Sequence, residues 1–278
     1  PKIAVSWNLT ERFKIRGSAS TTFRGPPSSF LSGTSTELAF IAPALAFKAL
    51  DTTGNPELEA EKAMALNVGA IFQSDAFYAS VDFWQFDFED PFQLENGNQI
   101  VGAYTEAQCA EGESGIGTTS CDVLRGRITP NGTAIAGIQR IQRFIVNGSD
   151  IKTSGLDYEA NYTWSEVLGG SVTMGLEGTY QLEYKSDDFV SSDGIFLASG
   201  GDFVGLSNEG VPFTPLPEMK TSFYIKWGND RHRLTMFARH VDGYDDTAPD
   251  TPAPLRVIDS HSTFDLTYVN TVSKYFTF

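Results

Sequence analysis

Apolar and polar side chains alternate along residues 171 to 184. One face carries Val172, Met174, Leu176, Tyr180, Leu182 and Tyr184, and the other carries Ser171, Thr173, Glu177, Gln181 and Glu183. A strand of a soluble sheet is about five or six residues long, whereas a tilted strand that crosses a bilayer needs about nine to eleven. The pattern therefore predicts a membrane-crossing strand, with lipid on its apolar face and the water of a barrel interior on its polar face.

The same alternation recurs in pairs of segments that are joined by short turns. Each pair is typical of a hairpin, because a short turn can connect only antiparallel strands. The pattern predicts nine strands and the beginning of a tenth. In chain order they cover residues 3–7 and 13–19, 64–72 and 77–83, an extended run 140–164 broken at 147–148 and its partner 171–184, 219–227 and 234–238, 264–268, and the start at 276–278.

Long, irregular polar connections separate the hairpins. They cover residues about 25–60, 91–139, 185–217 and 244–256. Outer-membrane barrels have short turns on the periplasmic side and long loops on the extracellular side. We therefore predict an all-β fold: part of an antiparallel, transmembrane, up-and-down β-barrel in the bacterial outer membrane, with these four connections outside the cell.

The alternation changes phase after Phe83. Beyond this residue the aromatic positions are Trp84, Phe86 and Phe88, with Gln85 and Asp87 between them. An extra residue in one strand of a pair produces such a change, so we predict a β-bulge where this strand leaves the membrane.

Charged and amide side chains occupy the polar face of several predicted strands. We expect seven of them to face the lumen: Asp157, Glu159, Glu177, Gln181, Glu183, Arg233 and Arg239. A soluble barrel would place them on its outside, but its strands would be no longer than its small core. The net charge of −15 excludes nucleic acid as a partner, since binding phosphates needs clustered Lys and Arg.

Chemistry-bearing residues are few. Cys109 and Cys121 are the only cysteines, and without nearby histidines they indicate a loop disulfide, with free thiols as the alternative. This loop either shapes a ligand entrance or is a passive clip. His232, His240 and His261 are the only histidines, and no Gly-x-Ser-x-Gly segment is present. We therefore predict no metal, no cofactor and no catalytic site.

Four segments resemble the TonB-dependent outer-membrane receptors. Residues 54–62, Gly-Asn-Pro-Glu-Leu-Glu-Ala-Glu-Lys, are the most specific, although Ala60 replaces the usual Pro. Residues 14–27 resemble a strand and loop entry of that family, with Gly25 in place of Ala, and residues 152–157 and 239–244 resemble later strands. These segments follow the family's order over nearly the whole chain.

The resemblance implies a plugged barrel of about twenty-two strands, of which this chain is a middle-to-late piece. It implies active uptake of a scarce nutrient (a siderophore, cobalamin or a carbohydrate), small-nutrient binding, contact with outer-membrane lipid, and energy from the TonB–ExbB–ExbD complex through a plug that has no counterpart in this sequence. Two alternatives remain open, a passive porin and, third, an outer-membrane barrel enzyme.

Overall fold

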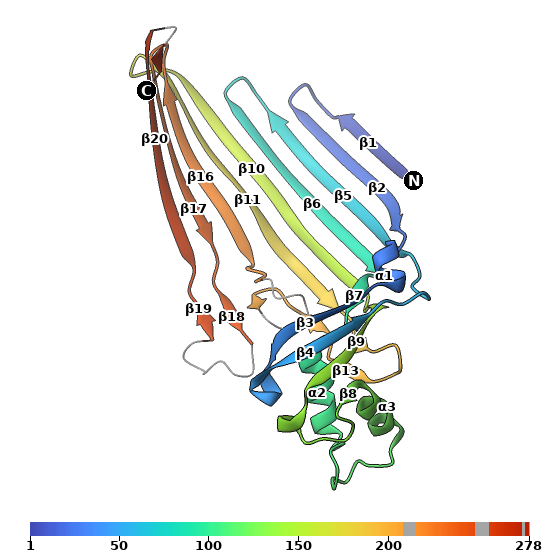
Figure 1. The fold of residues 1–278 in the computed structure, drawn as a ribbon. Helices are drawn as coiled ribbons and strands as arrows, with labels where there is room; N and C mark the ends of the chain where they lie inside the picture. Colours follow the sequence, from blue (N-terminus) through green and yellow to red (C-terminus); the bar gives the residue numbers. More distant parts are fainter. Residues whose placement is uncertain (208–214, 248–255, 274–275, 278) are drawn as a thin grey trace.

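The computed structural model describes residues 1–207, 215–247, 256–273 and 276–277. It consists of a long, curved antiparallel sheet and a smaller unit of strands and helices at one end of that sheet (Figure 1). Residues 208–214 and 248–255 of the predicted connections, and Phe278 at the end of the last predicted strand, lie outside the described residues.

Ten strands of the long sheet pair in sequence order, and each is antiparallel to its neighbour. Within the described residues, nine are long and the tenth is a short start, as the alternation predicted. They are β1 (Lys2–Asn8), β2 (Phe13–Arg24), β5 (Glu61–Gln73), β6 (Phe77–Glu89), β10 (Ile151–Val167), β11 (Gly170–Ser186), β16 (Met219–Gly228), β17 (His232–Val241), β20 (His261–Ser273) and β21 (Phe276–Thr277).

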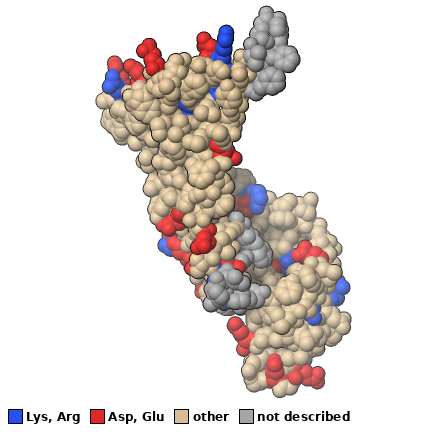
Figure 2. All heavy atoms as spheres, turned by 90° about the vertical axis from the view of Figure 1, so that its left-hand side faces the viewer, with Lys and Arg blue, Asp and Glu red and all other residues tan. Residues whose placement is uncertain are grey.

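The two faces of this sheet differ in polarity. Directly paired residues share a face, so the register defines a polar face, which carries Arg16 and Asp82, and an apolar face, which carries Leu66 and Val68. Apolar side chains are widely exposed; Ile3 and Phe264 retain 73% and 75% of their accessible surface. Figure 2 shows charged side chains gathered toward the ends of the sheet, with a band largely free of them between. The apolar face therefore suits lipid.

Tight turns close one end of the sheet (Figure 1). The β10–β11 turn has positive φ at both central residues, 51° at Leu168 and 68° at Gly169, as a type I′ hairpin turn requires. Aromatic rings form a row beside the turns: the Phe72 and Phe77 centroids are 6.0 Å apart, and those of Phe77 and Tyr162 are 6.5 Å apart. The row has the place of an interfacial girdle.

The predicted bulge after Phe83 is wrong. β6 pairs with β5 and with β10 without a register shift, and Phe83 and Trp84 follow each other in both ladders. The phase change therefore transfers the aromatic side chains from the apolar face to the polar face. A register shift occurs instead between β10 and β11, at Ser154/Gly155.

The first two long connections are not irregular loops but fold, together with part of the third, into a separate unit, which we call the loop unit. Its main sheet has the order β3-β4-β9-β7, with β8 paired to β9, and β4 and β9 are parallel. Its larger elements are α1 (Ser28–Ser32), β3 (Thr34–Ile41), η1 (Ala42–Ala44), β4 (Ala46–Thr53), β7 (Phe92–Leu94), α2 (Gly97–Glu106), α3 (Thr119–Arg127), β8 (Ile128–Thr129), η2 (Ile135–Gly137) and β9 (Arg140–Asn147).

The connection after β11 adds β12 (Phe189–Val190) and β13 (Phe196–Ala198) to this unit, and β14 (Gly201–Asp202) pairs with β11. Beyond it, β15 (Leu206–Ser207), β18 (Tyr244–Asp246) and β19 (Val257–Ile258) form a small sheet. The extended run predicted for residues 140–164 is therefore two strands: β9 lies in the loop unit, and the long sheet resumes at Ile151 because β9 pairs with β4 and β7 instead of β6.

The hydrophobic core lies in the loop unit. Its fully buried side chains include Ile100, Tyr104 and Ile141, and Phe189 and Leu197 from the connection after β11 pack into the same cluster. The long sheet is held mainly by backbone pairing and contributes little to this core. No helix within the described residues is long and apolar enough to cross a membrane.

Candidate functional site

The polar face of the long sheet is organised by an ion pair that spans three strands. Arg16 on β2 reaches across β5 to Asp82 on β6, with Nε 2.7 Å from Oδ1 and Nη2 2.5 Å from Oδ2. Gly69 lies between them in the register, and a Cβ at this position would collide with the Asp82 carboxylate. The missing side chain of Gly69 thus leaves room for a bidentate contact, the strong form of an arginine–carboxylate pair.

A cavity of about 650 Å³, which we call the wall cavity, lies against this polar face. Two carboxylates, Glu159 and Glu177, face each other directly across β10 and β11. Like charges in this position repel, and cations line the same cavity, among them Lys220 and Arg239. The wall cavity is therefore a charged, hydrated surface of mixed sign.

Six of the seven polar strand residues singled out by the alternation share the face of Asp82. Asp157 is paired with Asp82, and it accepts a hydrogen bond of 2.7 Å from the Thr179 hydroxyl. Arg239 forms an ion pair with Asp265. By register, the six residues on this face are Asp157, Glu159, Glu177, Gln181, Arg233 and Arg239.

Glu183 lies on the opposite face, contrary to the alternation. The register shift at Ser154/Gly155 pairs Gln181 with Gly155 but Glu183 with Ser154, so the strand changes phase between them. Glu183 consequently contacts two lysines at the loop end of the strands, with carboxylate oxygens 3.7 Å from Lys152 Nζ and 2.5 Å from Lys185 Nζ.

Other residues of the wall cavity were not singled out from the sequence. Arg16, Asp82 and Lys220 all line it. Their signal was present, because Arg16 falls between the apolar positions Ile15 and Gly17, and Lys220 occupies a polar position of its strand. Their pairing across three strands depends on register, which the sequence pattern does not specify.

A second cavity, of about 590 Å³, lies where the loop unit meets the ends of the strands; we call it the mouth cavity. Nine of its lining residues are apolar or aromatic and eight are polar or charged, a mixture that can bind and orient a small molecule. The apolar and aromatic side chains are Ala39, Phe40, Ile41, Leu50, Pro91, Phe92, Leu94, Ile151 and Tyr184, and the charged ones are Glu37, Glu95 and Arg143.

Glu95 in the mouth cavity belongs to a buried ionic cluster. It is completely buried, and its Oε2 accepts hydrogen bonds from Arg127 Nη1 at 2.6 Å and from the Phe144 amide at 2.9 Å. Arg127 also pairs with Asp193 at 2.6 Å, which ties the connection after β11 to α3. Oε1 of Glu95 is buried and has no hydrogen-bond partner within the described part of the chain.

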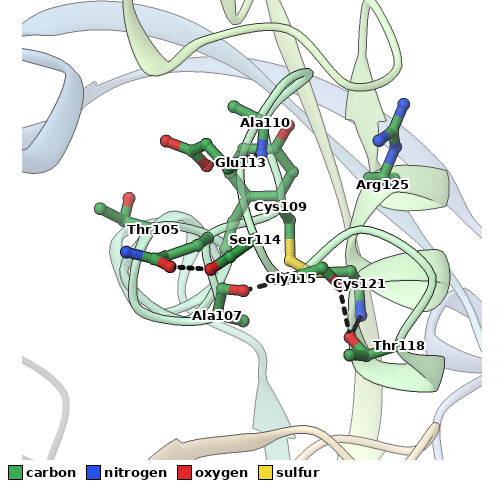
Figure 3. The surroundings of a disulfide bond; sticks show 12 residues. Thr105, Ala107, Cys109, Ala110, Glu113, Ser114, Gly115, Thr118, Cys121 and Arg125 are labelled. Atoms are coloured by element: carbon green, nitrogen blue, oxygen red, sulfur yellow. Dashed lines mark hydrogen bonds between the residues drawn. A yellow bond between two sulfur atoms is a disulfide. The ribbon is translucent and has the colours of Figure 1, made fainter.

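The cysteines form the expected disulfide, and both are fully buried (Figure 3). The bond connects the segment after α2 to the first turn of α3, with Cα atoms 5.1 Å apart. Thr118 caps α3, its hydroxyl accepting from the Cys121 amide at 3.3 Å. Both cysteines belong to the core of the loop unit, so the bond is a structural clip between two helices.

No group of three or more His, Cys, Asp or Glu residues that could hold a metal ion occurs in the part of the chain that the structure describes. His232 instead lies beside Tyr268, with 2.8 Å between Nδ1 and the hydroxyl oxygen.

Long, tilted antiparallel strands with an apolar outer band and a charged inner face define the chain as the wall of a large transmembrane β-barrel. A family model described as "TonB dependent receptor-like, beta-barrel" matches residues 1–278. The chain belongs to this family of outer-membrane receptors and transporters.

Two solved siderophore receptors are similar to this chain in fold. A mutant of the ferric enterobactin receptor PfeA from Pseudomonas aeruginosa, in complex with enterobactin, has a TM-score of 0.61 at 14% identity and covers 99% of this chain. The siderophore receptor PirA from Acinetobacter baumannii has a TM-score of 0.57 at 13% identity, again with 99% of this chain covered. The chain spans 33% and 35% of those two proteins. No curated protein sequence matches it.

Proposed function

We propose that this chain forms part of an outer-membrane receptor that imports a scarce nutrient, a siderophore in the first place, with energy from the TonB–ExbB–ExbD complex. The four long connections lie outside the cell and the tight turns face the periplasm. The apolar face of the long sheet contacts outer-membrane lipid, and the polar face lines the lumen.

The mouth cavity is the observation that carries this proposal. A loop unit with its own core holds a cavity of mixed apolar and polar lining at the open end of a charged barrel wall, where an external ligand arrives first. The siderophore class is supported by the similar structures, which are siderophore receptors.

The test is uptake of ⁵⁵Fe-labelled ferric enterobactin by cells whose only receptor is the full-length protein. We expect uptake to require both the receptor and TonB. Uptake that continues unchanged in a strain without TonB would contradict the proposal. Purified full-length receptor that shows a large, permanently open conductance in planar bilayers would indicate a passive pore instead.

A further inference from the structure

Three side chains that are typical of a nucleophilic site meet at the loop end of β17 and β20. The Ser262 hydroxyl oxygen lies 2.9 Å from Nδ1 of His240, and Nε2 of His240 lies 3.1 Å from Oδ1 of Asp242. His240 and Ser262 are 22 residues apart in the sequence, but they face each other directly in the ladder of the two strands. A nucleophile within hydrogen-bond reach of a base, with the base oriented by a third group, is the arrangement that activates a serine.

The partners of His240 determine which of its ring nitrogens carries the proton. An ionised Asp242 carboxylate accepts hydrogen bonds but donates none, so it favours the neutral imidazole with the proton on Nε2. Nδ1 is then the acceptor, and it faces the Ser262 hydroxyl. The two nitrogens have exchanged the places that they have in the common Ser-His-Asp triad, but one still donates and the other still accepts. His240 can therefore act as a general base toward Ser262.

The site lies on the apolar face of the long sheet, at the edge of the membrane. By register, the row of His240 leads across β16, β11 and β10 to Val81, which is exposed on the apolar face of β6. β17 has ten residues, the number that a tilted strand needs to cross a bilayer, and His240 is its last residue but one. The strands β17 and β20 run side by side up to this end (Figure 1). In the proposed orientation of the barrel, the site meets the outer leaflet where lipid gives way to water.

We propose that Ser262, His240 and Asp242 form an ester-cleaving site for acyl lipids of the outer leaflet, an activity beyond nutrient uptake. Ser262 and its two apolar neighbours on the same face of β20, Phe264 and Leu266, are all exposed. An acyl chain can lie along Phe264 and Leu266. The ester group of the lipid then reaches Ser262, because esters of membrane lipids lie between the hydrocarbon core and the headgroups.

The two side chains in contact supply the proton transfers of the reaction. Ser262 Oγ attacks the ester carbonyl carbon while its proton moves to Nδ1 of His240. The carbon–oxygen bond to the lipid alcohol breaks, and the leaving oxygen takes the proton from Nδ1. Water then attacks the acyl group on Ser262 and gives a proton to Nδ1. The fatty acid leaves, and the proton returns to Ser262 Oγ, so the sum is ester plus water to acid plus alcohol.

The direct test is labelling of the purified full-length receptor with a fluorescent alkyl fluorophosphonate, which bonds to activated serine oxygens with loss of fluoride. We expect a labelled peptide that contains Ser262. Ser262→Ala and His240→Gln are each expected to reduce its labelling at least tenfold. Asp242 orients the base without touching the substrate, so Asp242→Asn is expected to reduce labelling at least threefold and Asp242→Glu, which keeps the carboxylate, to recover part of it. Equal labelling of these two variants contradicts the role of Asp242.

Thr263→Ala is the matched control, because Thr263 is the next residue of β20 and is paired with Arg239 on the polar face. It is expected to leave labelling unchanged, and anomalous migration in SDS gels shows whether each variant is folded. Absence of label at Ser262 in the folded receptor overturns the inference. Equal labelling of the receptor and of His240→Gln overturns it too, because the three residues then form only a chain of surface hydrogen bonds.

Lipid hydrolysis tests the substrate class. The receptor is reconstituted in vesicles of phosphatidylethanolamine, and free fatty acid is measured by mass spectrometry. We expect Ser262→Ala to release at least tenfold less fatty acid than the receptor. Labelling of Ser262 without release of fatty acid overturns the assignment of lipid esters.

Uptake separates this inference from the proposed function. We expect Ser262→Ala to transport ferric enterobactin as the receptor does, because the site lies on the face turned away from the lumen. TonB-dependent uptake by a receptor that releases no fatty acid contradicts the ester-cleaving site alone. TonB-independent uptake by a receptor that releases fatty acid contradicts the proposed function alone.

Discussion

Arg16 and Asp82 are joined across an intervening strand, over a residue that has no side chain. The Asp82 side chain is 8% exposed, and its carboxylate receives both contacts from the Arg16 guanidinium. Since each of the three strands contributes one residue, the pair fixes the register of β2, β5 and β6 relative to one another. It is a cross-link in a wall that has almost no packed core.

Substitution of Gly69 should break this cross-link. Gly69→Val places atoms where the Asp82 carboxylate lies and leaves a poorly paired, buried charge, so we expect a loss of about 2–4 kcal/mol in stability. The measurement is the temperature at which the folded receptor loses its anomalous migration in SDS gels. Gly17→Ala is the control, because a Cβ there has its nearest neighbour, the Asn67 carbonyl oxygen, at an ordinary 3.6 Å. Equal effects of both substitutions would contradict the role of Gly69.

Removal of the disulfide should loosen the loop unit. In the chain-entropy model, closing a loop of about thirteen residues stabilises by about 3 kcal/mol, and both sulfur atoms lie in the core. We expect Cys109→Ser/Cys121→Ser to speed proteolysis between residues 110 and 120 at least tenfold, while the barrel wall stays resistant. The receptor treated with reductant is the comparison. Unchanged cleavage in both samples would count against a structural clip.

The loop unit should lose more stability when the charge of Arg127 alone is removed than when the charges of Arg127 and Glu95 are removed together. Arg127→Met leaves Glu95 buried and unpaired, which costs about 3–5 kcal/mol. Arg127→Met/Glu95→Gln removes that unpaired charge, so we expect it to recover a large part of the loss. The measurement is the unfolding of the loop unit, followed by limited proteolysis at increasing urea. A double variant less stable than Arg127→Met would show that the cluster acts otherwise.

The ion pair of Asp51 and Arg140 should make the loop unit sensitive to acid. Hydrogen bonds from Arg140 and from Thr36, which donates at 2.6 Å, lower the pKa of the Asp51 carboxyl below its usual range. A carboxyl with a lowered folded pKa adds stability above its unfolded pKa, and this contribution is lost as the pH falls through the folded value. We therefore expect Asp51→Asn to lower the stability of the loop unit at pH 7. Below about pH 4 the difference in stability between the variant and the original protein should become smaller. The measurement is the protease resistance of the variant and of the original protein between pH 3 and pH 7. A difference that does not change with pH would contradict the prediction.

The strands of the wall could be predicted because each has one face against lipid and one against water, which imposes a period of two on the sequence. β11 is the clearest case, and only the end of its alternation, at Glu183 and Tyr184, was assigned to the wrong faces. There a register shift, which depends on the neighbouring strand, overrides the period. The phase change in β6 was visible, but aromatic side chains on a polar face look the same in sequence as a bulge.

The alternation of apolar and polar residues could not predict the fold of the loop unit. Its core combines side chains from three connections, which are far apart in the sequence. Two features of α2 are visible in the sequence. Ile100 and Tyr104 are four residues apart, and Asn96 caps the helix by accepting from the Asn98 amide. These features extend over few residues, and the Gly- and Asn-rich stretch beside them indicated a loop, so the helix was not predicted. The Arg127 cluster joins residues 32 and 66 positions apart, which only the tertiary structure brings together.

The loop unit has a packed core, whereas the barrel wall is held by backbone pairing. This difference affects how the molecule unfolds. Reductant, protease and acid should destabilise the loop unit, whereas detergents and lipid exchange should affect the stability of the barrel wall. Heating the receptor should then give two calorimetric transitions instead of one, and a single melting temperature would not describe its stability.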